Sequence, residues 1–119
     1  MAKKIVIDLD NTISYSLEDY ESAEPNNDVV SKLLEYRSAG FTIVIHTSRN
    51  MRTYEGNLGL INVHTLPKII NWLNKHAVPY DEVIIGKPWC GDQGFYVDDR
   101  AIRPKEFLDL SYQDILKLL

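Results

Sequence analysis

The chain alternates between short apolar runs and longer amphipathic segments along most of its length. Four runs consist almost entirely of apolar and β-branched residues, and they lie at 4–7, 41–46, 82–86 and 94–97. Runs of this length without polar alternation are typical of strands that are covered on both faces of a parallel sheet. We therefore predict four parallel strands at these positions.

Helical patterns separate the first three predicted strands and recur at the end of the chain. They lie at 27–40, 65–76 and 111–119. The first has apolar residues at helical spacing and a glycine stop, and the other two begin with a hydroxyl side chain suited to cap a helix. Strands that alternate with helices indicate right-handed βαβ units. We predict one α/β domain over residues 1–119, with a parallel sheet flanked by helices.

Composition restricts the class of protein and its partners. The chain has 119 residues, 45% of them hydrophobic and 25% charged, with a net charge of −4. This acidic balance disfavours a general polyanion binder, so we expect no nucleic-acid partner. No run approaches the ~20 apolar residues of a membrane span, and Asp8 interrupts the apolar start too early for a signal peptide. A single cysteine, Cys90, excludes an internal disulfide, and we expect a cytoplasmic protein without a membrane partner.

Polar side chains follow each of the four predicted strands. In open α/β sheets, ligands bind beyond the carboxyl ends of the strands, so side chains at these positions are expected to meet on one rim. In strand order they are Asp8 and Asp10; Thr47, Ser48 and Arg49; Lys87; and Asp98, Asp99 and Arg100.

This combination of groups suits phosphoryl transfer. Several carboxylates at one site need a cation, because like charges at close range resist joint ionisation. Oxygen ligands without a nearby His or Cys suit Mg²⁺, and a lysine and a hydroxyl beside the metal can hold a phosphoryl group. Asp8 is then placed to act as a nucleophile, and Asp10 to protonate the leaving alcohol and afterwards activate water.

The same motifs resemble those of the haloacid dehalogenase (HAD) superfamily. DLDNT matches its DxDxT motif, and IVIHTSR, IIGKP and FYVDD resemble its second, third and fourth motifs, in the same order over nearly the whole chain. More narrowly, TSRNMRTYEGN, GKPWCG and YVDDRAIRPKEF resemble segments of small HAD phosphatases of bacterial capsule biosynthesis. The resemblance implies a single Rossmann-like core.

The resemblance also implies an activity and a set of roles. The activity is Mg²⁺-dependent hydrolysis of a phosphomonoester through an aspartyl phosphate, with Asp8 as nucleophile and Asp10 as acid and base. The implied substrate is a phosphorylated capsule precursor, which is a sugar phosphate or a small alcohol phosphate attached to a sugar. The phosphate-binding residues would be Thr47, Ser48 and Lys87. The metal ligands would be Asp8, Asp10 through its backbone carbonyl, Asp98, and Asp99 either directly or through water.

Substrate specificity is expected from the segment 49–64, because it follows the phosphate-binding Thr47 and loops after such strands carry specificity. The planar guanidinium group of arginine can bind phosphate and carboxylate groups of a substrate through two hydrogen bonds. The alternative for each arginine is an ion pair with Asp or Glu on the protein surface. The candidate substrate-binding residues are Arg49, Asn50, Arg52, Trp89, Arg100 and Arg103.

The chain has no room for a cap domain over this site. The segments 12–26 and 49–64 are long enough for flaps but too short for a folded cap. Phosphoryl chemistry benefits from a closed pocket, so a large substrate or a neighbouring subunit is expected to cover the site. Both segments carry aromatic and apolar residues, which predicts a homo-oligomer with contacts beside the site.

Three alternative interpretations remain. A nucleotide or nucleic-acid end phosphatase would use the same chemistry, but the acidic balance disfavours it. A catalytically silent HAD-like binding protein would not require every catalytic position to be filled. A response-regulator receiver domain is disfavoured, because its adjacent acidic pair follows the first strand. In this chain the adjacent pair, Asp98 and Asp99, follows the last predicted strand.

Overall fold

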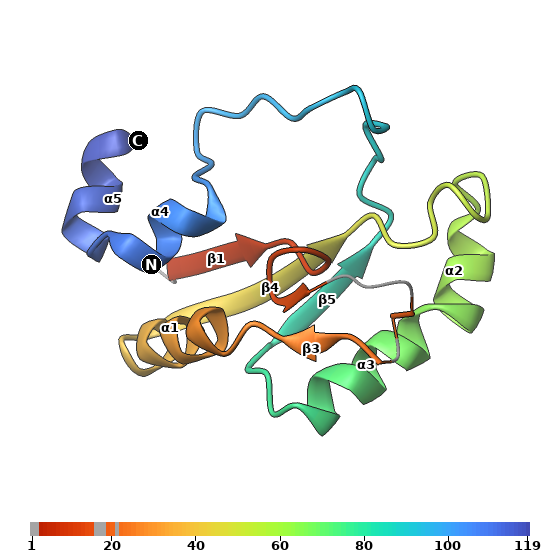
Figure 1. Cartoon of the computed structure of the whole chain (residues 1–119), viewed down its shortest axis with the longest axis horizontal. Helices are drawn as coiled ribbons and strands as arrows, with labels where there is room; N and C mark the ends of the chain where they lie inside the picture. Colours follow the sequence, from red (N-terminus) through yellow and green to blue (C-terminus); the bar gives the residue numbers. More distant parts are fainter. Residues whose placement is uncertain (1–2, 16–18, 21) are drawn as a thin grey trace. The chain divides into compact units, whose positions relative to one another are not determined.

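The computed structural model describes residues 3–15, 19–20 and 22–119 (Figure 1). The backbone divides into two compact units, Met1–Trp89 and Cys90–Leu119. A parallel three-stranded sheet lies in the first unit, and two short helices lie in the second. No helix in the described part of the chain is both long and apolar enough to cross a membrane.

The sheet of the first unit has the strand order β1-β4-β5, and both of its pairings are parallel. Parallel neighbours need a long crossover between them, and helices supply it here. The predicted α/β class with a parallel sheet is confirmed. The strands are β1 (Lys3–Ile7), β4 (Phe41–Thr47) and β5 (Glu82–Ile85), and the helices are α1 (Asn27–Ser38), α2 (Leu58–His64) and α3 (Leu66–Lys75).

Local capping signals explain where the helices of the first unit begin. The Asn26 side chain accepts a hydrogen bond from the backbone of Val29 and caps α1. Asn57 caps α2 in the same way, so this helix forms within the segment 49–64 that we predicted as a loop. We expected the Thr65 side chain to cap α3, but its hydroxyl group instead donates a hydrogen bond to the side chain of Asn50.

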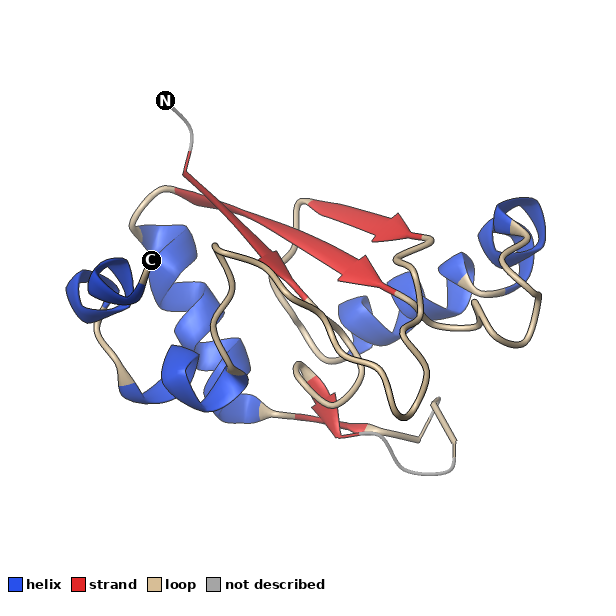
Figure 2. Cartoon of the chain, turned by 90° about the horizontal axis from the view of Figure 1, so that it is seen from above, coloured by secondary structure: helices blue, strands red, loops and turns tan. Residues whose placement is uncertain are grey.

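The two faces of the sheet differ in how well they are covered. Helices α1 and α3 lie on the same side of the sheet (Figure 2). Ile43 and Ile45 of β4 share one face by strand alternation and are fully buried, like Leu33 of α1. On the opposite face, Val44 of the central strand is 2% exposed, whereas Val6 and Ile84 of the outer strands are 60% and 45% exposed. Our prediction of strands covered on both faces therefore holds for β4 but not for the outer strands.

A small antiparallel hairpin follows the first strand. It consists of β2 (Ser14–Tyr15) and β3 (Glu24–Pro25) (Figure 2). The Trp72 indole donates a hydrogen bond of 2.9 Å to the carbonyl of Ala23, which ties this hairpin to α3. Residues 16–18 and 21 of the predicted 12–26 flap lie outside the described residues.

The second unit has α4 (Pro104–Asp109) and α5 (Tyr112–Leu118) as its regular elements. Ser111 caps α5, as predicted. The prediction of a strand at 94–97 is wrong, because this segment forms no strand. Its residues Phe95 and Val97 are 78% and 88% exposed. An apolar run becomes a strand only when another strand pairs with it, and the parallel sheet of the described residues consists of β1, β4 and β5 alone.

Candidate active site

The turn after β1 holds Asp8 in a defined orientation. Asn11 occupies the left-handed region with φ of 62°, which asparagine tolerates better than most residues. Successive backbone N–H groups after it donate to the carbonyl of Leu9, whose side chain is fully buried. The Thr12 hydroxyl donates a hydrogen bond of 3.2 Å to Asp8 Oδ2. The Asp8 carboxylate is therefore fixed from one side.

Lys87 faces the other oxygen of the same carboxylate. Its Nζ lies 3.7 Å from Asp8 Oδ1, which is longer than a hydrogen bond but close for two half-buried opposite charges. The Lys87 backbone N–H donates to the carbonyl of Thr47, so the end of β4 positions this residue. Gly86, directly before it, has φ of 88° and makes the turn that directs the lysine to Asp8.

We expect Gly86→Ala to destabilise the fold by about 1–3 kcal/mol, because a side chain at positive φ is strained. The new Cβ would also lie 2.6 Å from a methyl group of Leu58. Gly40 is a matched control, because it also has positive φ but open space around its Cβ position. Urea unfolding should show a larger loss for Gly86→Ala than for Gly40→Ala. Equal losses would mean that the contact with Leu58 relaxes without cost.

Arg49 connects the end of β4 to Asp10. Its backbone N–H donates to the hydroxyl of Thr47, which is 1% exposed. Its guanidinium contacts both carboxylate oxygens of Asp10, with Nη2 at 2.7 Å from Oδ1 and Nε at 3.1 Å from Oδ2. The guanidinium carbon also lies 4.2 Å from the centroid of the Tyr20 ring, a cation–π contact. This bidentate pair is buried on the arginine side and fixes the Asp10 carboxylate.

The sequence suggests Arg49 as a substrate-binding residue, with an ion pair as the alternative, and does not predict its contact with Asp10. The available signal was its position two residues after the end of β4. That signal becomes informative only once β1 and β4 are known to be neighbours, because Asp10 follows β1.

His46 is the residue of β4 directly before Thr47, and it lies near the charges of Lys87 and Asp8. Burial lowers the pKa of its imidazole below the ordinary value of 6.5, and the positive charge of Lys87 lowers it further. The carboxylate of Asp8 opposes this shift. The folded protein therefore favours the neutral imidazole.

We expect the free energy of unfolding to fall as the pH drops below about 6.5. The unfolded chain then protonates His46 at its ordinary pKa, whereas the folded chain takes up that proton only at lower pH. The variant His46→Gln should flatten this part of the pH profile in urea unfolding, and His64→Gln controls for the loss of an imidazole as such. A profile that is unchanged in His46→Gln would contradict the expectation.

Other predicted residues of the first unit have structural contacts of their own. Asn50 has φ of 61°, and its Oδ1 accepts a hydrogen bond of 2.7 Å from Thr65. Ser48 is half-buried beside Thr47, whereas Arg52 is exposed. Trp89, at the end of the unit, is 45% exposed. Their assigned roles in phosphate and substrate binding stay predictions.

The second unit carries the remaining predicted residues. Asp98 and Asp99 are exposed, and Asp98 Oδ1 accepts a hydrogen bond of 2.7 Å from the backbone of Arg100. The backbone N–H of Arg103 donates to the Glu106 side chain at the start of α4. The first unit thus holds Asp8, Asp10, Thr47 and Lys87 together with Arg49, whereas Asp98, Asp99, Arg100 and Arg103 belong to the second unit.

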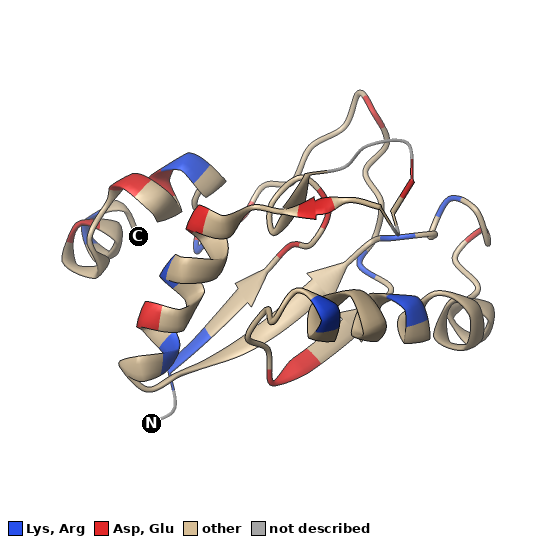
Figure 3. Cartoon of the chain, turned by 60° about the horizontal axis from the view of Figure 1, so that its bottom comes forward, with Lys and Arg blue, Asp and Glu red and all other residues tan. Residues whose placement is uncertain are grey.

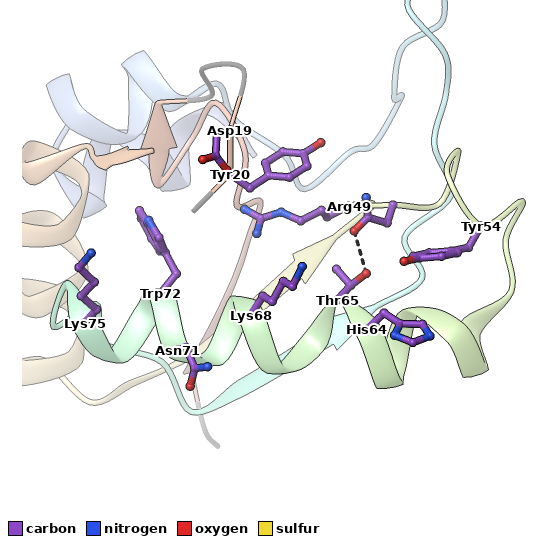
Figure 4. Close-up of a pocket in the computed structure, with 11 residues that line it drawn as sticks. Asp19, Tyr20, Arg49, Tyr54, His64, Thr65, Lys68, Asn71, Trp72 and Lys75 are labelled. Atoms are coloured by element: carbon purple, nitrogen blue, oxygen red, sulfur yellow. Dashed lines mark hydrogen bonds between the residues drawn. The ribbon is translucent and has the colours of Figure 1, made fainter. Parts of the chain in front are cut away.

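A cavity of about 510 Å³ opens beside Arg49 (Figure 4). One face of α3 supplies a wall, with side chains at spacings of three and four residues, and Figure 3 shows basic positions along this helix. Aromatic rings and cations line most of the cavity, and Asp19 is its one acidic residue among those described. The lining residues are Asp19, Tyr20, Arg49, Asn50, Tyr54, His64, Thr65, Lys68, Asn71, Trp72 and Lys75.

The predicted ligands have the chemistry that a magnesium ion requires, but the first unit contains only two of the four. Within the described ranges, no group of three or more His, Cys, Asp or Glu side chains is placed to hold a metal ion. The first unit supplies Asp8 and Asp10 from the predicted ligand set, and carboxylate oxygens are what Mg²⁺ prefers. The other two predicted ligands, Asp98 and Asp99, belong to the second unit.

The fold and this arrangement define a small Rossmann-like α/β domain with a carboxylate, a hydroxyl and a lysine at the carboxyl ends of its strands. No protein-family model matches the chain, and a comparison with curated proteins gives no match. The crystal structure of a protein from Vibrio cholerae is 56% identical, with a TM-score of 0.95, and the match covers 98% of this chain and 95% of that one. The chain belongs to the same family as this Vibrio cholerae protein.

Two more distant matches concern the fold alone. They are chains in two structures of the Pnkp1/Rnl/Hen1 complex, one of them described as an RNA repair complex. Their identities are 21% and 22%, with TM-scores of 0.52 and 0.51. Each match covers 91% of this chain but only 34% or 32% of the other chain.

Proposed function

We propose that the protein is a HAD-type phosphatase that hydrolyses a phosphomonoester with Mg²⁺ through an aspartyl phosphate at Asp8. The observation that carries this proposal is the environment of the Asp8 carboxylate. One of its oxygens is held by Thr12, and the other faces the ammonium of Lys87 at 3.7 Å. The order of the HAD-like motifs and the distant fold likeness support the same reaction class.

The proposed reaction has two steps. An Asp8 oxygen attacks phosphorus, the bond from phosphorus to the substrate alcohol oxygen breaks, and Asp10 gives its proton to that oxygen. Water then attacks the phosphorus of the aspartyl phosphate and loses a proton to Asp10, while the bond from phosphorus to Asp8 breaks. Free phosphate leaves, and both aspartates return to their starting states.

The chain's own cations would support both steps. Lys87 and the end of β4 at Thr47 would contact the phosphoryl oxygens, where charge is concentrated in the transition state. The bidentate contact of Arg49 orients the Asp10 carboxyl group, which would exchange a proton first with the alcohol and then with water. Bound Mg²⁺ would supply further charge neutralisation at the phosphoryl group. Asp8 and Asp10 would contribute to holding it.

The proposed substrate is a phosphorylated capsule precursor, either a sugar phosphate or an alcohol phosphate attached to a sugar. The cavity beside Arg49 would take the part of the substrate that carries no reacting phosphate. Its aromatic rings, such as Trp72, suit the apolar face of a sugar, and Lys68 and Lys75 suit a second anionic group. A nucleotide or nucleic-acid end is a second candidate, because rings and lysines in one cavity also suit a base and its phosphates.

A panel of phosphomonoesters, ranked by kcat/KM, tests the proposal and separates these substrates. It contains sugar phosphates, glycosylated alcohol phosphates, nucleotides and oligonucleotides with a terminal phosphate. We expect kcat/KM for a sugar-linked phosphate to be roughly tenfold or more above that for an aryl phosphate. A tenfold difference corresponds to about 1.4 kcal/mol of added binding free energy. A preference for oligonucleotide ends would favour the second candidate, and no hydrolysis of any member would refute both.

We expect Lys75→Gln to raise KM for the preferred anionic substrate by about three- to tenfold with little change in kcat, because the contact is made before and during the reaction. For a small aryl phosphate, which does not fill the cavity, KM should stay unchanged. The matched control is Lys32→Gln on α1, a lysine that pairs with Glu35 and does not line the cavity. An equal rise in KM for both substrates would contradict the role of the cavity.

A further inference from the structure

The outer edge of β1 offers a place for another strand. In the parallel sheet of the described residues, β1 pairs with β4 on one side, and no strand lies on its other side. The backbone N–H and C=O groups along such an edge form a template for pairing with a further strand. The last three residues of β1, 5–7, are all apolar, so a strand added here would extend the core as well as the hydrogen-bond ladder.

The sheet face that carries Val6 has apolar surface to cover. Strand register places Val6 beside Val44 and His46 beside Ile84, so these side chains lie on one face by the alternation of the strands. Val6 and Ile84 are 60% and 45% exposed, although β-branched residues in a parallel sheet are ordinarily buried on both faces. Val44 of the central strand is 2% exposed, so the apolar surface left to cover on this face lies on the outer strands, with Val6 directly at the edge strand β1.

The second unit carries the complementary features. The segment 94–97 has the sequence GFYV, the length and composition of a short strand, and both Phe95 and Val97 are strongly exposed. Helix α5 also exposes apolar side chains, with Leu116 at 41% and Leu118 at 54%. The connection into this segment bends at Gly91, which has φ of 79°.

We propose that two copies of this chain exchange their second units, so that residues 94–97 of each copy add to the free edge of β1 of the other. The strand order would become 94–97, β1, β4, β5. In a dimer with two-fold symmetry, each free edge receives the segment of the other copy, so both exposed surfaces are covered at once. This contact surface differs from the segments 12–26 and 49–64, which the sequence predicted as contacts between subunits.

The exchange would also complete the active site, a consequence that rests on the proposed function. Asp98 and Asp99 follow 94–97 directly, as Asp8 follows β1. The carboxyl ends of neighbouring parallel strands meet at the same edge of a sheet, so the added strand would bring both aspartates to the rim that carries the partner's Asp8. Each magnesium site would then take ligands from two chains.

Light scattering on the full chain tests the exchange without any need for activity. We expect the mass of two chains at tens of micromolar, and the mass of one chain for Val97→Lys with an unchanged far-UV circular dichroism spectrum. The matched control is Val63→Lys on α2, since Val63 is 64% exposed and lies outside the proposed contact. A monomeric wild type, or a Val97→Lys variant that stays dimeric, would overturn the proposal.

Mixing two inactive variants tests whether the site is shared between copies. Asp8→Asn lacks the nucleophile, and Asp98→Asn lacks the ligand on the exchanged segment. Unfolding and refolding them together should give mixed dimers in which one of the two sites is intact, restoring about a quarter of wild-type activity. A mixture that stays inactive would mean that each chain supplies its own 94–99. Inactivity of the wild type itself would refute the proposed function and leave the scattering result standing.

Discussion

Asp8→Asn should abolish phosphomonoester hydrolysis, with a loss of at least about 10⁴-fold in kcat. The amide is a poor nucleophile toward phosphorus, and it also removes the negative charge that faces Lys87 at 3.7 Å. The measurement is a steady-state assay with an aryl phosphate and Mg²⁺. EDTA should remove the activity of the wild type, and added Mg²⁺ should restore it.

Asp109→Asn is a matched control for this substitution. Asp109 is an exposed aspartate of α4, and it also has a lysine partner, Lys105, at 2.9 Å. Its replacement should leave kcat within about twofold, since exposed ion pairs contribute little. Activity of Asp8→Asn at the wild-type level would show that another group attacks phosphorus.

The second large effect is expected for Arg49→Lys. A lysine keeps the positive charge but cannot contact both oxygens of Asp10, so the acid–base group loses its fixed orientation. General acid–base catalysis contributes about 10²–10⁴-fold, and we expect a drop in kcat of roughly 10²-fold with little change in KM. Urea unfolding should show that Arg49→Lys is still folded under the assay conditions, so that the loss of kcat is not a loss of folded protein.

The pair of Arg37 and Asp81 provides a control with similar geometry. Its nitrogen and oxygen also lie 2.7 Å apart, and Asp81 stands just before β5, at the amino end of the strands. Arg37→Lys should therefore leave kcat and KM unchanged. If Arg49→Lys instead raised KM and kept kcat, Arg49 would be a substrate-binding residue, as the sequence suggested.

The positions of three strands could be predicted from sequence because each is a continuous apolar run. The predicted runs 4–7, 41–46 and 82–86 agree with β1, β4 and β5 to within one residue at either end. The run 94–97 looks the same in sequence, but whether it forms a strand depends on a neighbouring edge, which is a property of the assembled fold. Helix α2 was missed because Gly59 and the polar residues before it resemble a loop, although Asn57 gave a capping signal.

Part of the site could be predicted because its residues directly follow the continuous apolar runs that form strands. Asp8 and Lys87 follow predicted strands, and adjacent parallel strands bring such positions to one rim. The contact between Arg49 and Asp10 required the strand order β1-β4-β5, which no local pattern contains. The cavity beside Arg49 depends on side chains of α3 and of Tyr20 coming together, and a single sequence does not reveal such an arrangement.

Trapping of the phosphorylated enzyme tests the central claim most directly. The variant Asp10→Asn should still be phosphorylated by an aryl phosphate, whose leaving group needs little protonation, but should hydrolyse the aspartyl phosphate slowly. Acid quenching followed by mass spectrometry of peptides should then show phosphate on the peptide that contains Asp8. Release of about one aryl alcohol per active site before slow turnover should accompany it. Phosphate on another residue, or aryl alcohol released without any phosphorylated peptide, would contradict the account.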